Sequence, residues 1–317
     1  MSLKYNMKFY ASKIENRLND EMHKLSGKSK FNIKNEAQLI AQDFKTMGYR
    51  INTKFQSPTL ITQKDFLKLA QFWQEKGYAT GTMQDKVAAL RHILAACGNS
   101  RADVSNKALG IENSKRDVLN IGNENRGCKP LQETALNSIK DNSVRVAIKL
   151  IIQYGLRRDE ALHAVWALSK GRDIGQGGIL SIQGSWAKNG RPRSFQMADN
   201  GLALKDAAAL VKGFEIKGKV EQFRSRLDRQ FTKLKATENN KALHPHGLRH
   251  NYAQSRYLEI TGLAAPAAQG LNYKDMNKEQ RALYHSACKE IAQEMGHTRP
   301  EISNTYLENN IIYNIIK

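Results

Sequence analysis

Over most of this chain of 317 residues, apolar side chains recur every three or four positions, which is the spacing of helices with one buried face. Residues 62–76 are a clear case, because Phe66, Leu69 and Trp73 share one face and Gly77 follows the last turn. The other segments of the first part with this spacing are residues 8–48, with two helical patterns, and residues 82–97. This pattern excludes a large sheet, and we predict four or five short helices and no strand in the first part.

The second part departs from the helical pattern in one place. Its first segment, from Leu131 to Gly155, predicts one continuous buried helix. Residues 178–182 and 194–197 then have strand character, and the polar tip between them contains Asn189-Gly190, a favoured turn pair. We therefore predict a hairpin here and helices again from residue 202 onward.

The two parts are separated by a segment without apolar periodicity. Residues 115–130 are rich in Asn, Gly and charge, which is typical of a linker. We predict a helical N-terminal domain over residues 1–118, a linker over 119–128 and a second domain over 129–317.

Charge restricts the partners of the chain. Lys and Arg number 50 against 30 Asp and Glu, which gives a net charge of +20 spread over both parts. Such a surplus favours a polyanion, nucleic acid first, with an acidic membrane surface or a ribosomal partner as alternatives. The helix predicted over residues 219–235 has one basic face, which either is solvated or lies along a phosphate backbone.

Cysteine content and apolar run lengths restrict the compartment. Cys97, Cys128 and Cys288 are odd in number and far apart, which argues against a disulfide framework or a cysteine-based zinc site. No apolar run reaches the roughly 18 residues of a membrane span, and residues 1–17 have no signal-peptide core. We expect an intracellular protein that does not enter a membrane.

Four short segments of the second part carry residues suited to phosphate chemistry. They are Tyr154-Gly155-Leu156-Arg157-Arg158-Asp159-Glu160, Trp186-Ala187-Lys188-Asn189-Gly190-Arg191, His244-Pro245-His246-Gly247-Leu248-Arg249-His250, and Gly296-His297 with Tyr306 nine residues later. Arginines stabilise charge on phosphate oxygens, a lysine or histidine moves protons, and a tyrosine attacks only with help from a base and cations. Each segment alone can also be explained without a function. Arg157 could be a surface residue, Lys188 a solvated residue of a turn, His246 a helix cap, and Tyr306 a residue of the core.

A metal site is an alternative for the third segment, because it contains three histidines, His244, His246 and His250. No carboxylate or cysteine accompanies them, which argues against zinc. The occurrence of all four segments in one order in a basic chain favours phosphodiester chemistry.

Together these motifs resemble the tyrosine recombinase (phage integrase) family over roughly residues 129–310. The resemblance implies a mainly α fold with a small β-sheet or hairpin in the catalytic domain, and two domains that close on DNA as a C-shaped clamp. Residues 1–118 would be the core-binding (SAM-like) DNA-binding domain, and residues 129–317 the catalytic domain.

The resemblance also implies a role for each matching residue. Arg157 and Arg249 would clamp the scissile phosphate, and Lys188 would protonate the departing 5′-oxygen. His246 would take the proton of Tyr306, which attacks the phosphorus, while His297 would hydrogen-bond the phosphate. Glu160 would hold these residues in place from behind. The implied catalytic set is Arg157, Lys188, His246, Arg249, His297 and Tyr306, with Glu160 in support and no metal.

The implied reaction is site-specific integration or excision of a mobile element through a 3′-phosphotyrosyl intermediate. It needs neither ATP nor a cofactor, because the covalent link stores the bond energy. The implied partner is double-stranded DNA, bound by a homotetramer on synapsed sites and a monomer off DNA, with accessory bending or excision factors. The implied location is the bacterial cytoplasm, at the nucleoid.

Two departures from the family pattern concern assembly. The interval from Arg249 to His297 is longer than usual in the family. Its extra piece, around residues 262–290, includes the start of a helix predicted over 277–295. We interpret this piece as a filler loop rather than as a contact with another protein. Only a short apolar tail, residues 311–316, follows Tyr306; it either docks on a neighbouring protomer or packs on its own domain. Two other functions stay open: a type IB topoisomerase, and a DNA-binding protein that has lost catalysis.

Overall fold

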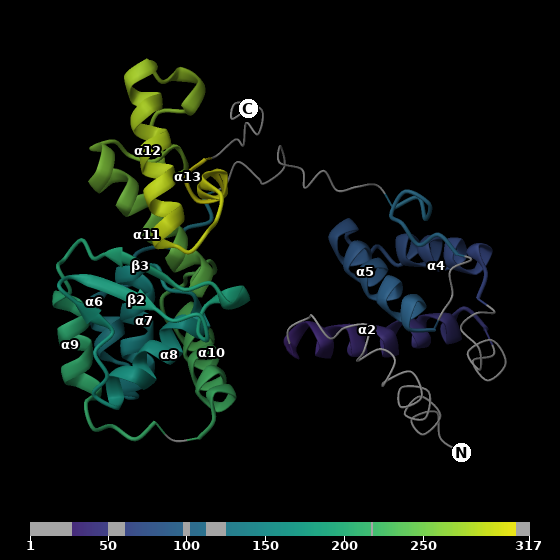
Figure 1. Cartoon of the computed structure of the whole chain (residues 1–317), viewed down its shortest axis with the longest axis horizontal. Coiled ribbons are helices and arrows are strands. Elements are labelled where there is room, and N and C mark those ends of the chain that lie inside the picture. Colours follow the sequence, from purple (N-terminus) through teal and green to yellow (C-terminus); the bar gives the residue numbers. More distant parts are fainter. Residues whose placement is uncertain (1–26, 50–60, 98–101, 112–124, 217, 309–317) are drawn as a thin grey trace. The chain divides into compact units, whose positions relative to one another are not determined.

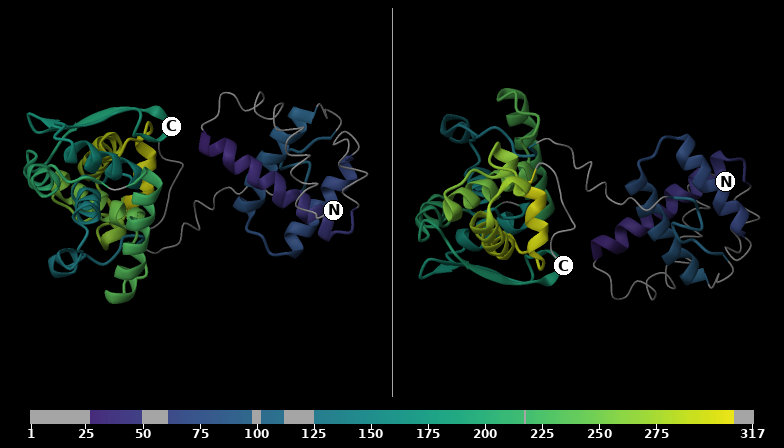
Figure 2. Two further views of the ribbon diagram at one scale, coloured as in Figure 1. Left: turned by 90° about the horizontal axis from the view of Figure 1, so that it is seen from below. Right: turned by 90° about the horizontal axis from the view of Figure 1, so that it is seen from above.

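The structure is a computed structural model that describes residues 27–49, 61–97, 102–111, 125–216 and 218–308. The chain divides into two units, Met1–Arg116 and Asp117–Lys317 (Figures 1 and 2). Each unit has its own hydrophobic core. The first helical pattern of residues 8–48, most of the predicted linker and the tail 311–316 lie outside the described residues. No described helix has the length and apolar character needed to cross a membrane.

The described part of the N-terminal unit is helical, as predicted. Its helices are α2 (Gly27–Thr46), α4 (Gln63–Glu75) and α5 (Thr80–Cys97). The Thr62 side chain accepts the Asp65 backbone N–H at the start of α4, and the Asp65 carboxylate accepts the Thr62 N–H in return. Trp73, fully buried, donates to Asp43 of α2 at 2.9 Å, which ties α4 to α2.

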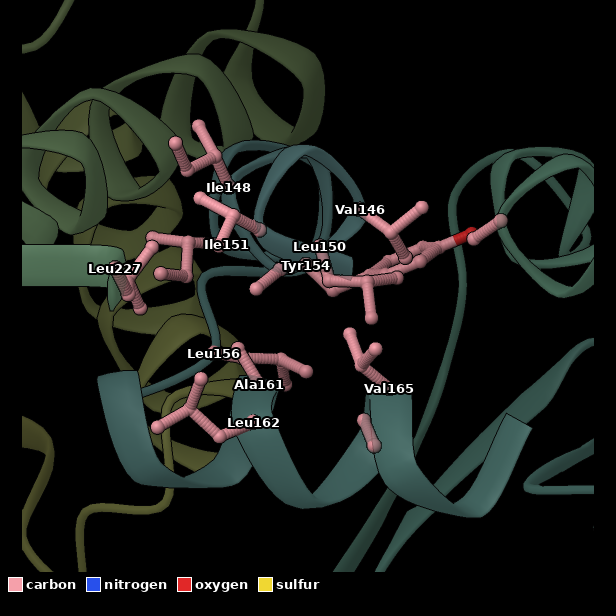
Figure 3. Packing of buried hydrophobic residues seen from close by; sticks show 14 of the residues in the cluster. Val146, Ile148, Leu150, Ile151, Tyr154, Leu156, Ala161, Leu162, Val165 and Leu227 are labelled. Carbon is pink, nitrogen blue, oxygen red and sulfur yellow. The ribbon is translucent and has the colours of Figure 1, made fainter. Parts of the chain in front are cut away.

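The C-terminal unit begins with three helices that pack around one apolar cluster. They are α6 (Glu133–Asn137), α7 (Asn142–Tyr154) and α8 (Arg158–Ser169). Figure 3 shows apolar side chains of α7 and α8 gathered between the two helices, with Leu227 at one side of the cluster. These apolar contacts fix the junction between the two helices, residues 155–157.

The predicted continuous helix from Leu131 to Gly155 is wrong. The Asp141 carboxylate accepts the backbone N–H groups of Ser143 and Val144 at 3.0 and 3.2 Å, so α7 starts afresh at this residue. An aspartate at this position satisfies N–H groups that have no partner inside a helix, and two helices therefore replace one.

The hairpin is confirmed, but its tip differs from the prediction. Strands β1 (Gly175–Gln176), β2 (Ile179–Ile182) and β3 (Arg193–Gln196) form one antiparallel sheet in the order β1-β2-β3. Ile182 pairs with Arg193, so residues 183–192 make the connection, and Asn189-Gly190 belongs to the short 3₁₀ turn η2 (Lys188–Gly190) rather than to a two-residue turn. The first strand was not predicted, because two residues carry no alternation.

The remaining helices build the rest of the unit. They are α9 (Leu202–Val211), α10 (Val220–Thr237), α11 (Pro245–Thr261), α12 (Lys278–Glu294) and α13 (Asn304–Leu307), with 3₁₀ turns η3 (Pro266–Ala268), η4 (Tyr273–Asp275) and η5 (Pro300–Ser303). On α10, Arg224 and Arg226 form ion pairs with Asp159 and Asp141, so part of its basic face holds α8 and α7.

The helix predicted in the insert is confirmed as α12, with Asn277 accepting the Gln280 N–H at its start. A third apolar cluster joins it to α11 and α13 (Figure 1). The prediction of a mainly helical chain with a small sheet is confirmed; the C-shaped arrangement on DNA stays a prediction.

Candidate active site

A cleft of about 580 Å³ lies on the C-terminal unit, where the ends of several elements meet. The start of α8, the turn η2, the first turn of α11, the loop after α12, and α13 all contribute to its walls. All six residues predicted to be catalytic line it: Arg157, Lys188, His246, Arg249, His297 and Tyr306. Folding thus brings together side chains from four distant segments, and Arg158 and Arg191 add further positive charge to the same walls.

Arg157 stands at the junction between α7 and α8. Gly155 ends α7 with φ +57°, and a Cβ there would lie 2.3 Å from the Tyr252 ring, so this position requires glycine. The Arg157 guanidinium donates to Glu160 at 2.9 Å and to the Gly296 carbonyl at 3.0 Å. With two anchors behind it and a side chain 21% exposed, Arg157 presents the rest of its fork to the cleft.

Arg249 is the buried member of the predicted clamp. It is 3% exposed, and its two terminal nitrogens donate to the carbonyls of Gly155 and Met295. Burial lowers the pKa of its guanidinium, and the charge of Arg157 lowers it further, whereas Tyr306 and Glu160 raise it. Arginine remains protonated in proteins, so this is a fixed positive charge in a water-poor wall.

Glu160 is fully buried and holds two arginines. Its carboxylate accepts Arg157 and receives both terminal nitrogens of Arg193 at 2.9 and 2.8 Å. Burial by itself raises the pKa of Glu160, but the hydrogen bonds and charge of Arg193 and the charge of Arg157 lower it to about 2. The carboxylate is therefore ionised at any physiological pH, and it lies behind the cleft wall, as the prediction of a supporting role requires.

Arg193 is the residue that sequence reasoning missed. It opens β3 with its side chain 7% exposed, and it also donates to the Glu294 carbonyl at 2.8 Å. A signal was present: the predicted strand has Phe195 and Met197 on its buried face, and two-residue alternation puts Arg193 on that face as well.

The histidines of the third segment have separate roles. His244, not His246, caps α11, because its Nδ1 accepts the Gly247 N–H at 2.9 Å. His246 is left facing the cleft, with its ring 5.6 Å from the Tyr306 ring. Burial lowers the pKa of His246, with further lowering by the nearby charge of Arg249, so the imidazole is neutral at pH 7 and able to accept a proton. Among the described residues, no three His, Cys, Asp or Glu side chains are grouped to hold a metal ion.

Tyr306 and His297 meet across the cleft floor. The Tyr306 hydroxyl lies 3.3 Å from His297 Nε2, and the tyrosine is 4% exposed on α13. Burial, together with the charges of Arg249, Arg157 and Arg193, lowers the pKa of His297 to about 3. His297 is therefore neutral and serves as a hydrogen-bonding group rather than a cation.

Lys188 occupies the rim of the cleft. It opens η2 with an exposed side chain, on the loop between β2 and β3. Trp186, two residues earlier, stacks on His163 of α8 with ring centroids 6.1 Å apart, which anchors the base of this loop. An exposed ammonium on a loop of this length can approach a leaving oxygen that enters the cleft.

Comparisons with known proteins give one family match and one similar solved structure. Residues 122–255 match the model of the Integrase family, a segment that contains Arg157, Lys188, His246 and Arg249. No curated protein matches the chain. Among solved structures, that of XerA recombinase is similar over 93% of this chain and 92% of its own, with 15% identity and a TM-score of 0.33. The family match over residues 122–255 supports an assignment to the phage integrase family of tyrosine recombinases.

Proposed function

We propose that the chain is a site-specific DNA recombinase that cleaves and rejoins strands through a 3′-phosphotyrosyl intermediate. The observation that carries the proposal is the convergence of Tyr306 with two arginines, two neutral histidines and a lysine on one cleft. A protein that only binds DNA has no use for a buried phenol aimed at a neutral imidazole among guanidinium groups.

In the cleavage step, the Tyr306 oxygen bonds to the phosphorus and the bond from phosphorus to the 5′-oxygen breaks. The phenol proton passes to His246, and Lys188 gives a proton to the 5′-oxygen, which leaves as a hydroxyl. Arg157 and Arg249 stabilise the charge that builds on the non-bridging oxygens, and His297 donates a hydrogen bond to one of them.

The electrostatics of the cleft support these roles. A histidine accepts the phenol proton only if it is neutral, and the lowered pKa of His246 meets this condition at pH 7. The Tyr306 hydroxyl now contacts His297, and a phosphate between the arginines offers His297 a stronger, anionic acceptor. Rejoining is the same step in reverse, with a 5′-hydroxyl of the partner duplex as nucleophile, and leads to integration or excision of a mobile element in the cytoplasm.

The test is a covalent trap. Duplex fragments from the DNA that flanks the coding sequence of this chain are nicked at random with DNase I and incubated with the protein. Cleavage close to a nick releases a short strand that diffuses away, so the adduct accumulates and is read on a denaturing gel. The matched control is Tyr273→Phe, because Tyr273 also contacts a histidine, His285, at 2.7 Å, but outside the cleft.

We expect adducts with the wild type and with Tyr273→Phe, and none with Tyr306→Phe at unchanged DNA affinity. Tight binding without an adduct would instead indicate a catalytically silent DNA-binding protein. Relaxation of supercoiled plasmid of arbitrary sequence, without joining of two duplexes, would indicate a type IB topoisomerase.

A further inference from the structure

Three arginines converge on the C-terminal end of α12. Arg193 Nε donates to the Glu294 carbonyl at 2.8 Å, Arg249 Nη2 to the Met295 carbonyl at 3.2 Å, and Arg157 Nη2 to the Gly296 carbonyl at 3.0 Å. The last carbonyls of a helix have no partner within it and carry its negative partial charge, so they are suited to cations. The end of the helix that precedes His297 is therefore an anchor for the arginines of the cleft.

Arg193 differs from the other two in what it can reach. Arg157 and Arg249 line the cleft, whereas Arg193 does not. All three of its donor nitrogens are directed at protein acceptors, one at the Glu294 carbonyl and two at Glu160. Arg193 thus acts on a bound phosphate only through its neighbours.

Those neighbours include Arg157. Glu160 Oε1 accepts Arg157 Nη1 and Arg193 Nη1, both at 2.9 Å, and Oε2 accepts the Arg157 backbone N–H and Arg193 Nη2, both at 2.8 Å. Each carboxylate oxygen is therefore shared between the two arginines. Without Arg193, the carboxylate keeps only its two hydrogen bonds to Arg157, so one side of each oxygen loses its support and the position of the Arg157 fork is less firmly set.

Arg193 also connects two other parts of the site. It begins β3, directly after the loop that carries Lys188, and it holds the helix end that leads through Gly296 to His297. A Cβ at Gly296 would lie 2.8 Å from Nη1 of both Arg157 and Arg193, so the two guanidinium groups pack against this turn.

We propose that Arg193 is a positioning residue for strand cleavage, which holds Glu160 and the end of α12 so that Arg157 and His297 face the scissile phosphate. The proposal rests on the proposed function. It distinguishes Arg193 from a purely structural core arginine, because its loss should reduce the rate of chemistry more than DNA affinity or stability.

The experiment compares Arg193→Gln and Arg193→Lys with a matched control, Arg281→Gln. Arg281 lies on α12, the helix whose end Arg193 contacts, and it donates to the backbone carbonyl of Lys274 at 2.9 Å, but it does not line the cleft. The probe is the randomly nicked flanking DNA described above. The readouts are the single-turnover rate of adduct formation, the DNA dissociation constant and the thermal midpoint of unfolding.

We expect Arg193→Gln to slow adduct formation about 100-fold, the cost of a misplacement of about 1 Å, with DNA affinity within about threefold of wild type. Arg193→Lys keeps the positive charge but lacks the guanidinium fork. This variant should therefore fold and should cleave about 10-fold more slowly than the wild type. Rates for both variants equal to that of Arg281→Gln overturn the proposal and leave the proposed function standing. A wild type without Tyr306-dependent adducts overturns both.

A second readout separates positioning from structure. Arg193→Gln removes the main groups that lower the pKa of Glu160, so cleavage by this variant should begin to fall at a higher pH than cleavage by the wild type. Glu160→Gln in the same chain should remove this shift. The double variant should be no more than about threefold slower than the slower single variant, because both changes act through one carboxylate. Rate losses that multiply, with a pH profile of Arg193→Gln equal to that of the wild type, contradict the proposal.

Discussion

Gly296 offers the sharpest test of how the cleft is built. It follows α12 with φ +70°, a conformation that costs a residue with a Cβ about 1–2 kcal/mol. A Cβ here would also lie 2.8 Å from Nη1 of both Arg157 and Arg193. To restore an ordinary contact of about 3.5 Å, each guanidinium has to move by about 0.7 Å from its present position.

The chain contains a matched control for the backbone part of this cost. Gly262 follows α11 with φ +71°, and a Cβ at this position would have no other atom within 4 Å. Gly262→Ala and Gly296→Ala should therefore lose similar backbone stability, about 1 kcal/mol, or about 2–4 °C in the thermal midpoint of a domain of this size. Only Gly296→Ala displaces the arginines.

We expect Gly296→Ala to slow adduct formation about 10- to 100-fold, which is about 1.4–2.7 kcal/mol in activation free energy, and Gly262→Ala to leave the rate unchanged. The assay is the single-turnover covalent trap, with calorimetry for stability. Equal rates for the two variants would refute the argument that the turn at Gly296 sets the arginine geometry.

Three further predictions concern ionisable groups. Glu160→Gln should lower the free energy of unfolding by roughly 3 kcal/mol at pH 7. The pKa of Glu160 is about 2 in the folded chain and near 4.3 in the unfolded chain, so the ionised carboxylate stabilises the fold at any pH above the unfolded pKa. The difference from the wild type, measured by urea titration, should shrink between pH 4 and pH 2. Cleavage should be flat from pH 8 to 6.5 and fall only below the lowered pKa of His246, and a single-turnover profile of His246→Ala should lack that limb. Lys188→Ala should cleave about 100- to 1000-fold more slowly than the wild type. Its rate should recover on a duplex with sulfur as the bridging 5′ atom, because a thiolate leaves without protonation. A rate that does not recover would show that Lys188 is not the general acid.

Much of the helical architecture could be predicted from the sequence because it depends on local periodicity. The face of Phe66, Leu69 and Trp73 is buried as its spacing indicates, and α12 begins after Asn277, where the helix of the insert was predicted to start. The break at Asp141 was missed because the apolar pattern continues on both sides of it. A capping aspartate overrides such a pattern through two hydrogen bonds.

The residues that line the cleft could be predicted from the sequence, but the contacts among them could not. Motif spacing identified Arg157, His246 and Tyr306, which the fold does bring to one cleft. Spacing could not show that His244 caps the helix, that the Tyr306 hydroxyl contacts His297, or that Arg193 shares Glu160 with Arg157. These contacts depend on side chains from elements far apart in sequence, and only packing determines them.

The anchoring of the arginines on the last turn of α12 has a consequence for how this part of the chain can vary in length. The site depends on where α12 ends, because Glu294, Met295 and Gly296 hold the arginines there. Residues 262–277, which lead into the start of α12, contribute no side chain to the cleft. An insertion between the buried residues of this segment should thus leave the arginines in place, whereas one residue added to the last turn of α12 would rotate its carbonyls by about 100° and misalign all three arginines.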